Sequence, residues 1–246
     1  MTININSNER IDDLQRNGYR IIQNPSLFCF GMDAVLLSAF AKVKKDEKVL
    51  DFCTGNGVIP ILLEARTKGS HYTGLEIQDT SADLAMRSVM LNNLGDKIDI
   101  VKGNVVEASD IFKGASFNVI TCNPPYFKKK DDSIINDNKI KSIARHEIEM
   151  ELEDVMIISK ALLKNEGSLV LVHRTDRLIE IIELMKKHNI EPKRMRLIYP
   201  KVNAESNLVL IDGRKNGKEG LKILPPLYIH NDDNSYTSEV LEMFGK

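Results

Sequence analysis

Residues 51–57, Asp-Phe-Cys-Thr-Gly-Asn-Gly, place a carboxylate directly before a glycine-rich turn. The glycines at positions 55 and 57 let the backbone turn tightly and approach a ligand without an intervening Cβ. A helix that begins after them directs free N–H groups at that ligand. A pyrophosphate fits poorly, because Asp51 would repel it and Pro60 stands where a dinucleotide-binding motif has its third glycine. The segment favours a cationic ligand such as S-adenosylmethionine; the alternative is an ordinary strand-to-helix turn.

Glu76 lies near the end of a second predicted strand, Tyr72–Ile77, 25 residues after Asp51. An acidic side chain at the tip of the second strand can accept hydrogen bonds from both ribose hydroxyls of an adenosine. Charge-assisted hydrogen bonds of this kind contribute about 1.5–3 kcal/mol each. We therefore expect Glu76 and the neighbouring Ile77 to bind the nucleoside part of the same ligand, although a surface Glu at a strand end is also common.

Asn123-Pro124-Pro125-Tyr126 comes one residue after a fourth apolar run, Phe117–Thr121. Two prolines fix φ and remove two N–H donors, which leaves a rigid exit with bare carbonyls. The Asn amide oxygen and a proline carbonyl can accept both hydrogens of a planar amine, while the Tyr ring stacks on it. The amine lone pair is then free for in-line attack on a methyl carbon. The orientation of the two reactants would supply most of the rate enhancement. Asn123, Pro124 and Tyr126 are thus the candidate catalytic residues; a plain strand-ending turn is the alternative.

The elements that must position these residues alternate between strands and helices. We predict strands over 48–52, 72–77, 97–102, 117–121, 167–173, 194–199 and 207–211, and helices over 58–66, 79–94, 151–163 and 176–188. The last two strands have no helix between them and should form an antiparallel hairpin. In the 79–94 helix we expect capping by Asp79 or Thr80 and a buried stripe formed by Leu84, Met90, Leu91 and Leu94. This order predicts an α/β fold with helices on both faces of a mostly parallel sheet and a ligand beyond the carboxyl ends of the strands.

The composition of the 246 residues is that of a globular protein, with 42% hydrophobic and 28% charged residues. With 34 basic and 35 acidic residues the net charge is −1, so any attraction to nucleic acid must be local. The three cysteines are far apart in sequence, which favours neither a metal centre nor a disulfide framework. Finding no signal segment and no apolar run long enough to cross a bilayer, we expect a cytoplasmic protein.

Taken together, Asp51–Gly57, Glu76 and Asn123–Tyr126 resemble class I S-adenosylmethionine-dependent methyltransferases that modify amino groups. Three further segments, Phe30–Leu37, Ala144–Glu147 and Leu224–Tyr228, narrow the resemblance to the bacterial tRNA1(Val) adenine-N6 methyltransferase family, over nearly the whole chain. The resemblance implies a Rossmann-like sheet of seven strands with the last antiparallel. It also implies one methyltransferase domain over 1–246, in which 1–45 cover the cofactor site and 46–246 form the catalytic core.

The resemblance also implies which residues bind the cofactor, S-adenosyl-L-methionine, and its product S-adenosyl-L-homocysteine. These are Asp33, Asp51, Thr54, Gly55, Asn56, Gly57, Glu76, Ile77 and Asn104. Two positions depart from the common pattern of the superfamily. Asn104 stands where an Asp is more frequent, and Cys53 stands at the first position of the glycine loop, which is often a glycine.

The implied substrate is a tRNA, methylated at N6 of the adenosine next to the anticodon of a valine tRNA. Between residues 127 and 146 there are six basic and three acidic residues, and between 186 and 222 there are ten basic and four acidic residues. Both runs are candidate phosphate-binding surfaces, although charge runs are often only solvated faces. The candidate substrate-binding residues are Pro125, Phe127, Lys128, Lys129, Lys130 and Arg145. We expect no metal and leave the choice of monomer or dimer open.

Three other functions stay open. A protein glutamine N5-methyltransferase would use the same four-residue motif, but that family normally adds a sizeable N-terminal helical domain, and only about 45 residues precede the first central strand here. An rRNA guanine-N2 methyltransferase would use a variant of the motif. A non-catalytic RNA-binding protein with a methyltransferase fold is disfavoured by the intact set of Asp51, the glycine loop, Glu76 and Asn123–Tyr126.

Overall fold

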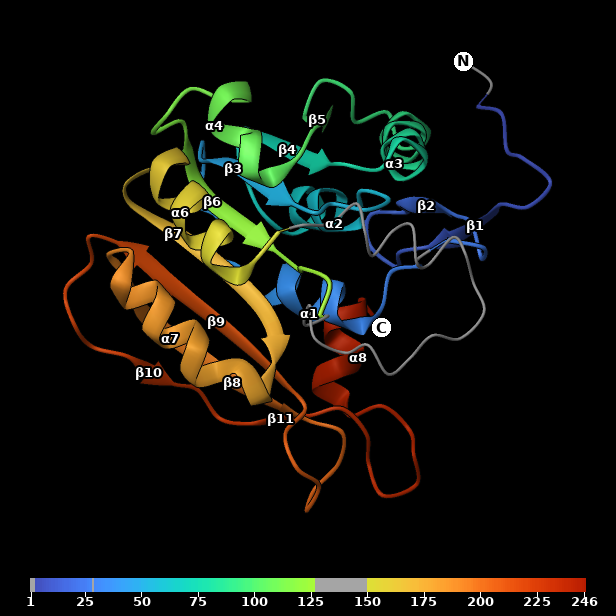
Figure 1. Cartoon of the computed structure of the whole chain (residues 1–246). Helices are drawn as coiled ribbons and strands as arrows, with labels where there is room; N and C mark the ends of the chain where they lie inside the picture. Colours follow the sequence, from blue (N-terminus) through green and yellow to red (C-terminus); the bar gives the residue numbers. More distant parts are fainter. Residues whose placement is uncertain (1–2, 28, 127–149) are drawn as a thin grey trace, which may run out of the picture.

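Strands alternate with helices along the part of the chain that the structure describes, residues 3–27, 29–126 and 150–246 of a computed structural model (Figure 1). The strands are β1 Arg10–Asp13, β2 Arg20–Gln23, β3 Lys48–Phe52, β4 His71–Glu76, β5 Ile98–Lys102, β6 Phe117–Cys122, β7 Leu163–Arg174, β8 Ile190–Tyr199, β9 Leu208–Lys215, β10 Lys222–Ile223 and β11 Leu227–Tyr228. The helices are α1 Met32–Phe40, α2 Val58–Arg66, α3 Asp79–Leu91, α4 Ala108–Ile111, α6 Leu152–Leu162, α7 Leu178–Lys187 and α8 Ser238–Phe244, with 3₁₀ turns η1 Val105–Glu107 and η2 Thr175–Arg177.

The main sheet has the order β10-β8-β9-β7-β6-β3-β4-β5, with β11 also paired to β8. Neighbouring strands are parallel except at β9, which is antiparallel to both β7 and β8. The predicted α/β class, the parallel core and the antiparallel hairpin are confirmed. The predicted count of seven is wrong for this sheet, which has nine strands in the described residues, because β10 and β11 are too short to show an alternating pattern. The separate β1–β2 hairpin was also not predicted.

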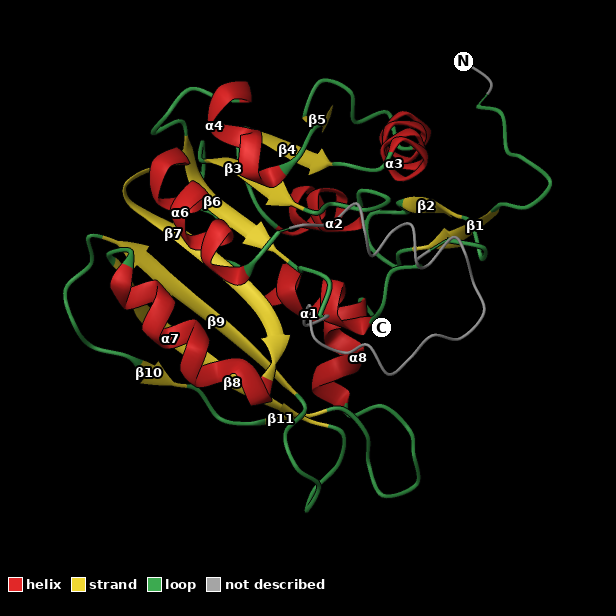
Figure 2. Cartoon of the chain, in the orientation of Figure 1, coloured by secondary structure: helices red, strands yellow, loops and turns green. Residues whose placement is uncertain are grey.

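Helices cover both faces of the main sheet (Figure 2). Helices α1, α2, α3 and α8 contribute to one core cluster, and α4, α6 and α7 contribute to the other. Along each strand, successive side chains point to alternate cores: Val49 packs into the first cluster and Leu50 into the second, while Val170 and Leu171 do the same on β7. Burial on both faces explains why these strands are continuous apolar runs.

Helix α2 matches its predicted bounds, whereas α3 differs from the prediction in three respects. Its N-cap is Gln78, and no side chain caps it, so the predicted capping by Asp79 or Thr80 is wrong. It ends at Leu91, because Asn93 adopts a φ of 56°, which an α-helix does not allow. Of the predicted buried stripe, Leu84 and Leu94 are buried, but Met90 is 55% exposed and Leu91 is half-buried; Ala82, Ala85, Ser88 and Val89 complete the buried face of α3.

Helix α8, at the C-terminal end of the described chain, packs against α1 and against the segment around Arg16. Its buried Val240 joins the same core cluster as α1. The guanidinium groups of Arg16 and Arg66 donate to the carbonyl oxygens of Glu242 and Met243 near its C-terminus, where unpaired helical carbonyls need partners. In the described ranges, the helices are all too short or too polar to cross a membrane.

Candidate active site

Three strand ends meet at one edge of the main sheet. Phe52 at the end of β3 is in register with Leu75 of β4 on one side and with Cys122 of β6 on the other. The glycine loop that follows β3 therefore lies between Glu76 and Asn123 at this edge. The chain passes from β3 through β4 to β5 and then returns to the other side of β3 as β6, so this edge is the switch point where ligands of such sheets bind. The structure thus brings together the three segments that were singled out in the sequence.

Asp51 is fully buried at the end of β3. Its Oδ1 accepts a hydrogen bond of 2.6 Å from the Thr121 hydroxyl on β6, and its Oδ2 has no partner among the described residues. Burial raises the pKa of Asp51 to about 7, and the Thr121 hydrogen bond opposes that rise. A buried carboxylate oxygen without a partner is costly and attracts a cation or a hydrogen-bond donor.

The loop between β3 and α2 contains three residues with positive φ: Cys53 at 55°, Gly55 at 57° and Gly57 at 83°. Gly57 is the N-cap of α2, and a Cβ built on it would lie 3.2 Å from the Cβ of Ala85 on α3. Glycine at 57 therefore serves both the turn and the close packing of two helices. A Cβ on Gly55 would meet no described atom within 4 Å, so one side of the loop is open.

Glu76 is only 6% exposed, and burial raises its pKa. Its Oε2 accepts from the backbone N–H of Gly55 at 2.8 Å, and its Oε1 accepts from the N–H of Gln78 at 2.9 Å. These two bonds fix the carboxylate against the glycine loop. Each oxygen keeps a second lone pair, which a neighbouring pair of hydroxyl groups could use.

The hydroxyl of Tyr126 turns back toward its own motif and toward the N-terminal segment. Its oxygen lies 2.7 Å from Asn123 Oδ1 and 3.0 Å from Asp33 Oδ2, at the start of α1. Burial, followed by the charge of Asp33, raises the pKa of Tyr126 well above its usual range, so the phenol keeps its proton. Pro124, between Asn123 and Tyr126 in the sequence, is buried, and its ring fixes the backbone of the motif.

His173 near the end of β7 was missed in the sequence. Its ring meets the Tyr126 ring edge-on, with centroids 5.1 Å apart and planes at 61°. Burial, followed by the charge of Arg177, lowers the pKa of His173 to about 4, so the ring is neutral and its Nδ1 accepts from the N–H of Arg174 at 2.8 Å. The signal was available, because His173 is also a polar residue at a strand end on this edge. Thr121, the partner of Asp51, was missed because it lies inside a strand.

Other predicted cofactor residues lie at the same edge but have backbone partners. Thr54 is buried and its N–H donates to the Leu75 carbonyl at 3.1 Å. The amide of Asn56 donates to the carbonyl of Ile22 on β2 at 3.5 Å, and Asn104 Oδ1 accepts from the N–H of Val106 at 3.2 Å as the cap of η1. The side chains of Asn56 and Asn104 thus hold the loops around the site, whereas the buried Thr54 hydroxyl has no hydrogen-bond partner among the described residues. Ile77 follows Glu76 and is half-buried.

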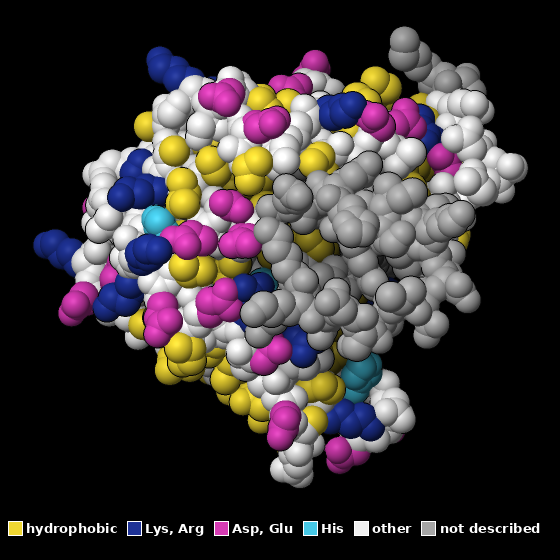
Figure 3. All heavy atoms as spheres, in the orientation of Figure 1, with side chains coloured by type: hydrophobic (Ala, Val, Ile, Leu, Met, Phe, Trp, Pro, Cys, Tyr) yellow, Lys and Arg dark blue, Asp and Glu magenta, His cyan; other side chains and the backbone are white. Residues whose placement is uncertain are grey.

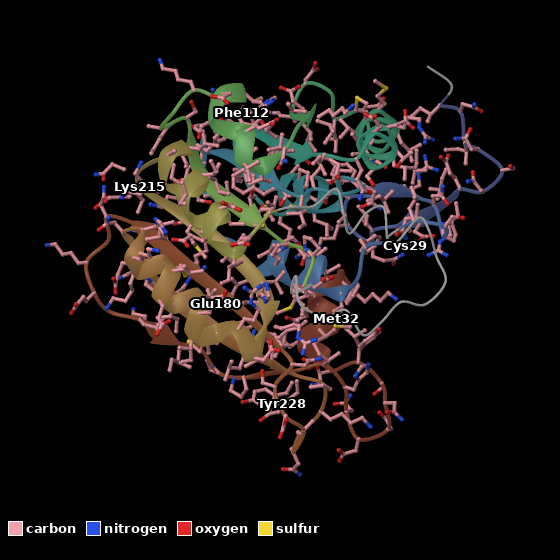
Figure 4. All side chains as sticks on the ribbon, in the orientation of Figure 1. Cys29, Met32, Phe112, Glu180, Lys215 and Tyr228 are labelled. Atoms are coloured by element: carbon pink, nitrogen blue, oxygen red, sulfur yellow. The ribbon has the colours of Figure 1, made fainter. Side chains whose placement is uncertain are left out.

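The basic run 186–222 does not form one surface. Because β8 and β9 are antiparallel, Lys215 lies opposite Ile190 at the far edge of the sheet, and Tyr199, paired with Tyr228, lies at the edge of Asn123. Figure 4 labels Lys215 and Tyr228 at opposite ends of this half of the molecule. The candidate phosphate-binding run 186–222 is therefore divided between two opposite edges of the sheet, and only its part near Tyr199 lies at the edge of Asn123.

Several cations of this run also have structural partners, namely Lys187 with Glu153 at 2.6 Å, Arg194 with Asp212, Arg196 with Glu239 at 2.6 Å, and Lys215 with the Leu163 carbonyl at 2.7 Å. On the face shown in Figure 3, basic and acidic side chains are interspersed over α6 and α7. The other predicted cationic run, with Phe127, Lys128, Lys129, Lys130 and Arg145, lies outside the described residues.

The segment Leu224–Tyr228, which carried part of the family resemblance, has a structural role in the described chain. Leu227 is buried and pairs with Ile198 of β8. Arg196 donates to the carbonyls of Pro225 and Pro226 at 2.8 and 3.3 Å. The carbonyls of the two prolines thus accept hydrogen bonds from Arg196, and these bonds hold the segment before β11 against β8.

Comparison with known proteins agrees with this geometry. Residues 18–189 match the methyltransferase small domain family. One relative, the tRNA1(Val) (adenine(37)-N6)-methyltransferase of Aliivibrio salmonicida, is 23% identical over 86% of both chains. The enzyme of the same name from Bacteroides thetaiotaomicron is 33% identical over 59% of this chain and 60% of its own length.

Solved structures show the same fold. A predicted O-methyltransferase from Agrobacterium tumefaciens superimposes with a TM-score of 0.69 at 20% identity, covering 86% of this chain and 95% of that one. The tRNA m1G37 methyltransferase of M. jannaschii gives a TM-score of 0.58 at 17% identity, covering 87% of this chain and 56% of that one. These results confirm the predicted Rossmann-like fold and the predicted enzyme class, an S-adenosylmethionine-dependent methyltransferase. By its match over most of its length, the chain belongs to the methyltransferase small domain family.

Proposed function

We propose that this enzyme transfers the methyl group of S-adenosylmethionine to N6 of an adenosine in tRNA. The observation that carries the proposal is the register of β3 and β6, which sets the glycine loop beside Asn123. A donor at the first strand end would then face an amine at the second. The relatives named as tRNA1(Val) (adenine(37)-N6)-methyltransferases support the choice of adenine and of tRNA.

The residues at the end of β3 fit the donor. Asp51 offers a buried carboxylate oxygen without a described partner, which suits a ligand that carries an ammonium and a sulfonium. Glu76 would accept from the ribose hydroxyls, and the open side of Gly55 gives the backbone close access to the ligand. Thr54, Asn56, Gly57, Ile77 and Asn104 would shape or line this pocket. Residues 1–45 would cover it as part of one domain that spans residues 1–246.

The acceptor side would work by positioning rather than by a general base. Asn123 Oδ1 and the Pro124 carbonyl would accept the two N6 hydrogens, and Pro125 and Tyr126 would pack against the base. Accepting both hydrogens shifts the nitrogen lone pair out of conjugation with the ring and toward the methyl group. The donor supplies an activated methyl on a good leaving group, so the proton can leave after transfer. Orientation would supply most of the rate enhancement.

The target base would leave its stack in the anticodon loop to reach this pocket. Phe127, Lys128, Lys129, Lys130 and Arg145 would contact the tRNA, with the cations on its phosphates. A tRNA substrate places the reaction in the cytoplasm.

The test uses total tRNA from a strain that lacks this gene. The purified enzyme is incubated with this tRNA and isotopically labelled S-adenosylmethionine, and the nucleosides are analysed by mass spectrometry. We expect labelled N6-methyladenosine, and Asn123→Ala should reduce the rate by roughly 10²–10³-fold through loss of one preorganised partner of the reacting group. Labelled N2-methylguanosine, or label found only in protein glutamine, would contradict the proposal.

A further inference from the structure

The Tyr126 hydroxyl lies between two oxygen atoms that compete for its single hydrogen. Asp33 Oδ2 is 3.0 Å away and Asn123 Oδ1 is 2.7 Å away. A carboxylate can only accept, and a phenol donates one hydrogen, so one of the two contacts would leave oxygen facing oxygen. A half-turn of the Asn123 amide removes the conflict at no cost in volume. Tyr126 then donates to Asp33 and accepts from the NH₂ group of Asn123.

We propose that Asp33 is a positioning residue that orients the Asn123 amide through Tyr126. By taking the Tyr126 hydrogen, Asp33 makes the phenol oxygen an acceptor for Asn123 Nδ2, and Asn123 Oδ1 is left facing the amine that is to be methylated. This inference deepens the proposed function and rests on its assignment of Asn123 as the acceptor of the amine hydrogens. It gives Asp33 a role on the acceptor side of the site, in place of the predicted role in cofactor binding.

The surroundings hold Asp33 in place for this role. It lies in the first turn of α1, where its Oδ1 accepts from the N–H of Ala34 at 2.9 Å. A Cβ on Gly31 would come within 2.8 Å of that same oxygen, so the glycine leaves room for the carboxylate. On the other side, the ring of His173 limits how far Tyr126 can turn. Asp33 Oδ2 is therefore presented to a phenol 93 residues away in the sequence.

Loss of the Asp33 carboxylate should let the Asn123 side-chain amide turn back by half a turn. An Asn at position 33 can turn its NH₂ group toward the Tyr126 oxygen, so the phenol hydrogen is no longer reserved for residue 33. The Tyr126 hydroxyl can then donate to Asn123 Oδ1, and that oxygen is occupied when the amine arrives. The amine would lose one of its two acceptors, but the donor pocket at Glu76 and Gly55 would be unchanged. The effect should fall on kcat, whereas a residue that binds the cofactor would change the affinity for S-adenosylmethionine.

The kinetic test is a double-mutant cycle. Asp33→Asn should lower kcat by about 10–100-fold, as expected for one misplaced hydrogen-bond partner of the reacting group, with the Kd of S-adenosylmethionine by calorimetry within about 2-fold of the wild type. In a Tyr126→Phe background, Asp33→Asn should lower kcat by no more than about 2-fold, since Asp33 acts through the missing hydroxyl. The exposed Asp96→Asn is the matched control. Multiplicative losses in the double variant, or a weaker Kd at unchanged kcat, would overturn the proposal.

A second measurement needs no substrate. In ¹⁵N-labelled protein, the NH₂ signals of Asn123, identified by their loss in Asn123→Asp, should exchange with water more slowly than those of the exposed Asn8. Tyr126→Phe and Asp33→Asn should each speed this exchange by roughly 10-fold, the value of one hydrogen bond. If the Asn123 NH₂ group exchanges as fast as that of Asn8 in the wild type, the proposal is wrong. A failure to methylate tRNA would instead contradict the proposed function and leave this result standing.

Discussion

At the scale of single residues, the site is built from carboxylates that are held where their charge is costly. Asp51 and Glu76 are both buried and both have raised pKa values, because burial disfavours their charged forms. Native structures usually pair such groups, yet Asp51 Oδ2 has no described partner. The cost is consistent with a site shaped for a positive ligand, whose arrival would stabilise the charge.

Asp51→Asn should change how stability depends on pH. The pKa of Asp51 is about 7 in the folded protein and near 4 in the unfolded chain, so between these values the folded state holds the extra proton and stability falls as pH rises. From pH 5 to pH 8, the wild type should therefore lose roughly 2–3 kcal/mol more unfolding free energy than the variant. Glu76 shifts in the same direction, but it is present in both proteins and largely cancels. Urea denaturation at both pH values measures the difference, and parallel losses would show that Asp51 does not titrate in this range.

The placement of the candidate residues at one edge of the sheet was largely predictable, because their sequence signals are local. Asp51 and Glu76 lie near the ends of apolar runs and Asn123 follows one, and the edge at which parallel strands end was enough to place them together. The contact between Asp33 and Tyr126 was not predictable, since it joins positions 93 residues apart and depends on how α1 meets the sheet. The contact between Tyr126 and His173 depends in the same way on the placement of β7 beside β6.

At the scale of elements, the loop between β3 and α2 determines the geometry of the donor side. The central strands of the main sheet were predictable from apolar runs of five to seven residues, because burial on both faces leaves a strong pattern. Strands β10 and β11, with two residues each, carry no such pattern. The end of α3 was placed too late, because the turn at Asn92 and Asn93 is followed by a buried Leu94 that continues the helical spacing.

Gly57→Ala tests the packing of this loop. The variant must place a Cβ at a φ of 83° and 3.2 Å from the Ala85 side chain, so we expect a loss of about 1–3 kcal/mol in unfolding free energy. Gly95→Ala is the matched control, because its Cβ would meet no described atom within 4 Å and its φ is not positive. Denaturant unfolding of both variants should separate them, and equal stabilities would contradict the role given to Gly57.

At the scale of the whole molecule, the course of the strands in the sheet, and not nearness in the sequence, determines where charged residues and the C-terminal helix lie. The basic run 186–222 is divided between two edges because β8 and β9 run in opposite directions. Arg196 and Arg194 are held by Glu239 and Asp212, partners that no local pattern indicates. The net charge of a sequence segment therefore did not predict where a basic surface forms.

Deleting residues 238–246 should weaken the N-terminal segment as well as the C-terminus. The deletion removes the buried Val240 and the carbonyls that accept from Arg16 and Arg66, and it exposes the face of α1 on which α8 packs. We expect a cost of about 2–4 kcal/mol, or several degrees in Tm, mostly from lost burial. Deleting Lys246 alone is the control. An unchanged Tm for the longer deletion would show that α8 contributes little.

The chain forms β3, β4 and β5 before it returns to the other side of β3 as β6. The glycine loop and the Asn-Pro-Pro-Tyr motif therefore lie in different parts of the sequence. A cut at the exposed turn near Gly114 would leave the donor loop of β3 and β4 on one fragment and the Asn-Pro-Pro-Tyr motif on the other. Neither fragment would hold both reactants, so methylation would be restored only when the two fragments rejoin. This strand order makes the protein a natural starting point for a split methyltransferase whose restored activity reports that two fused proteins have met.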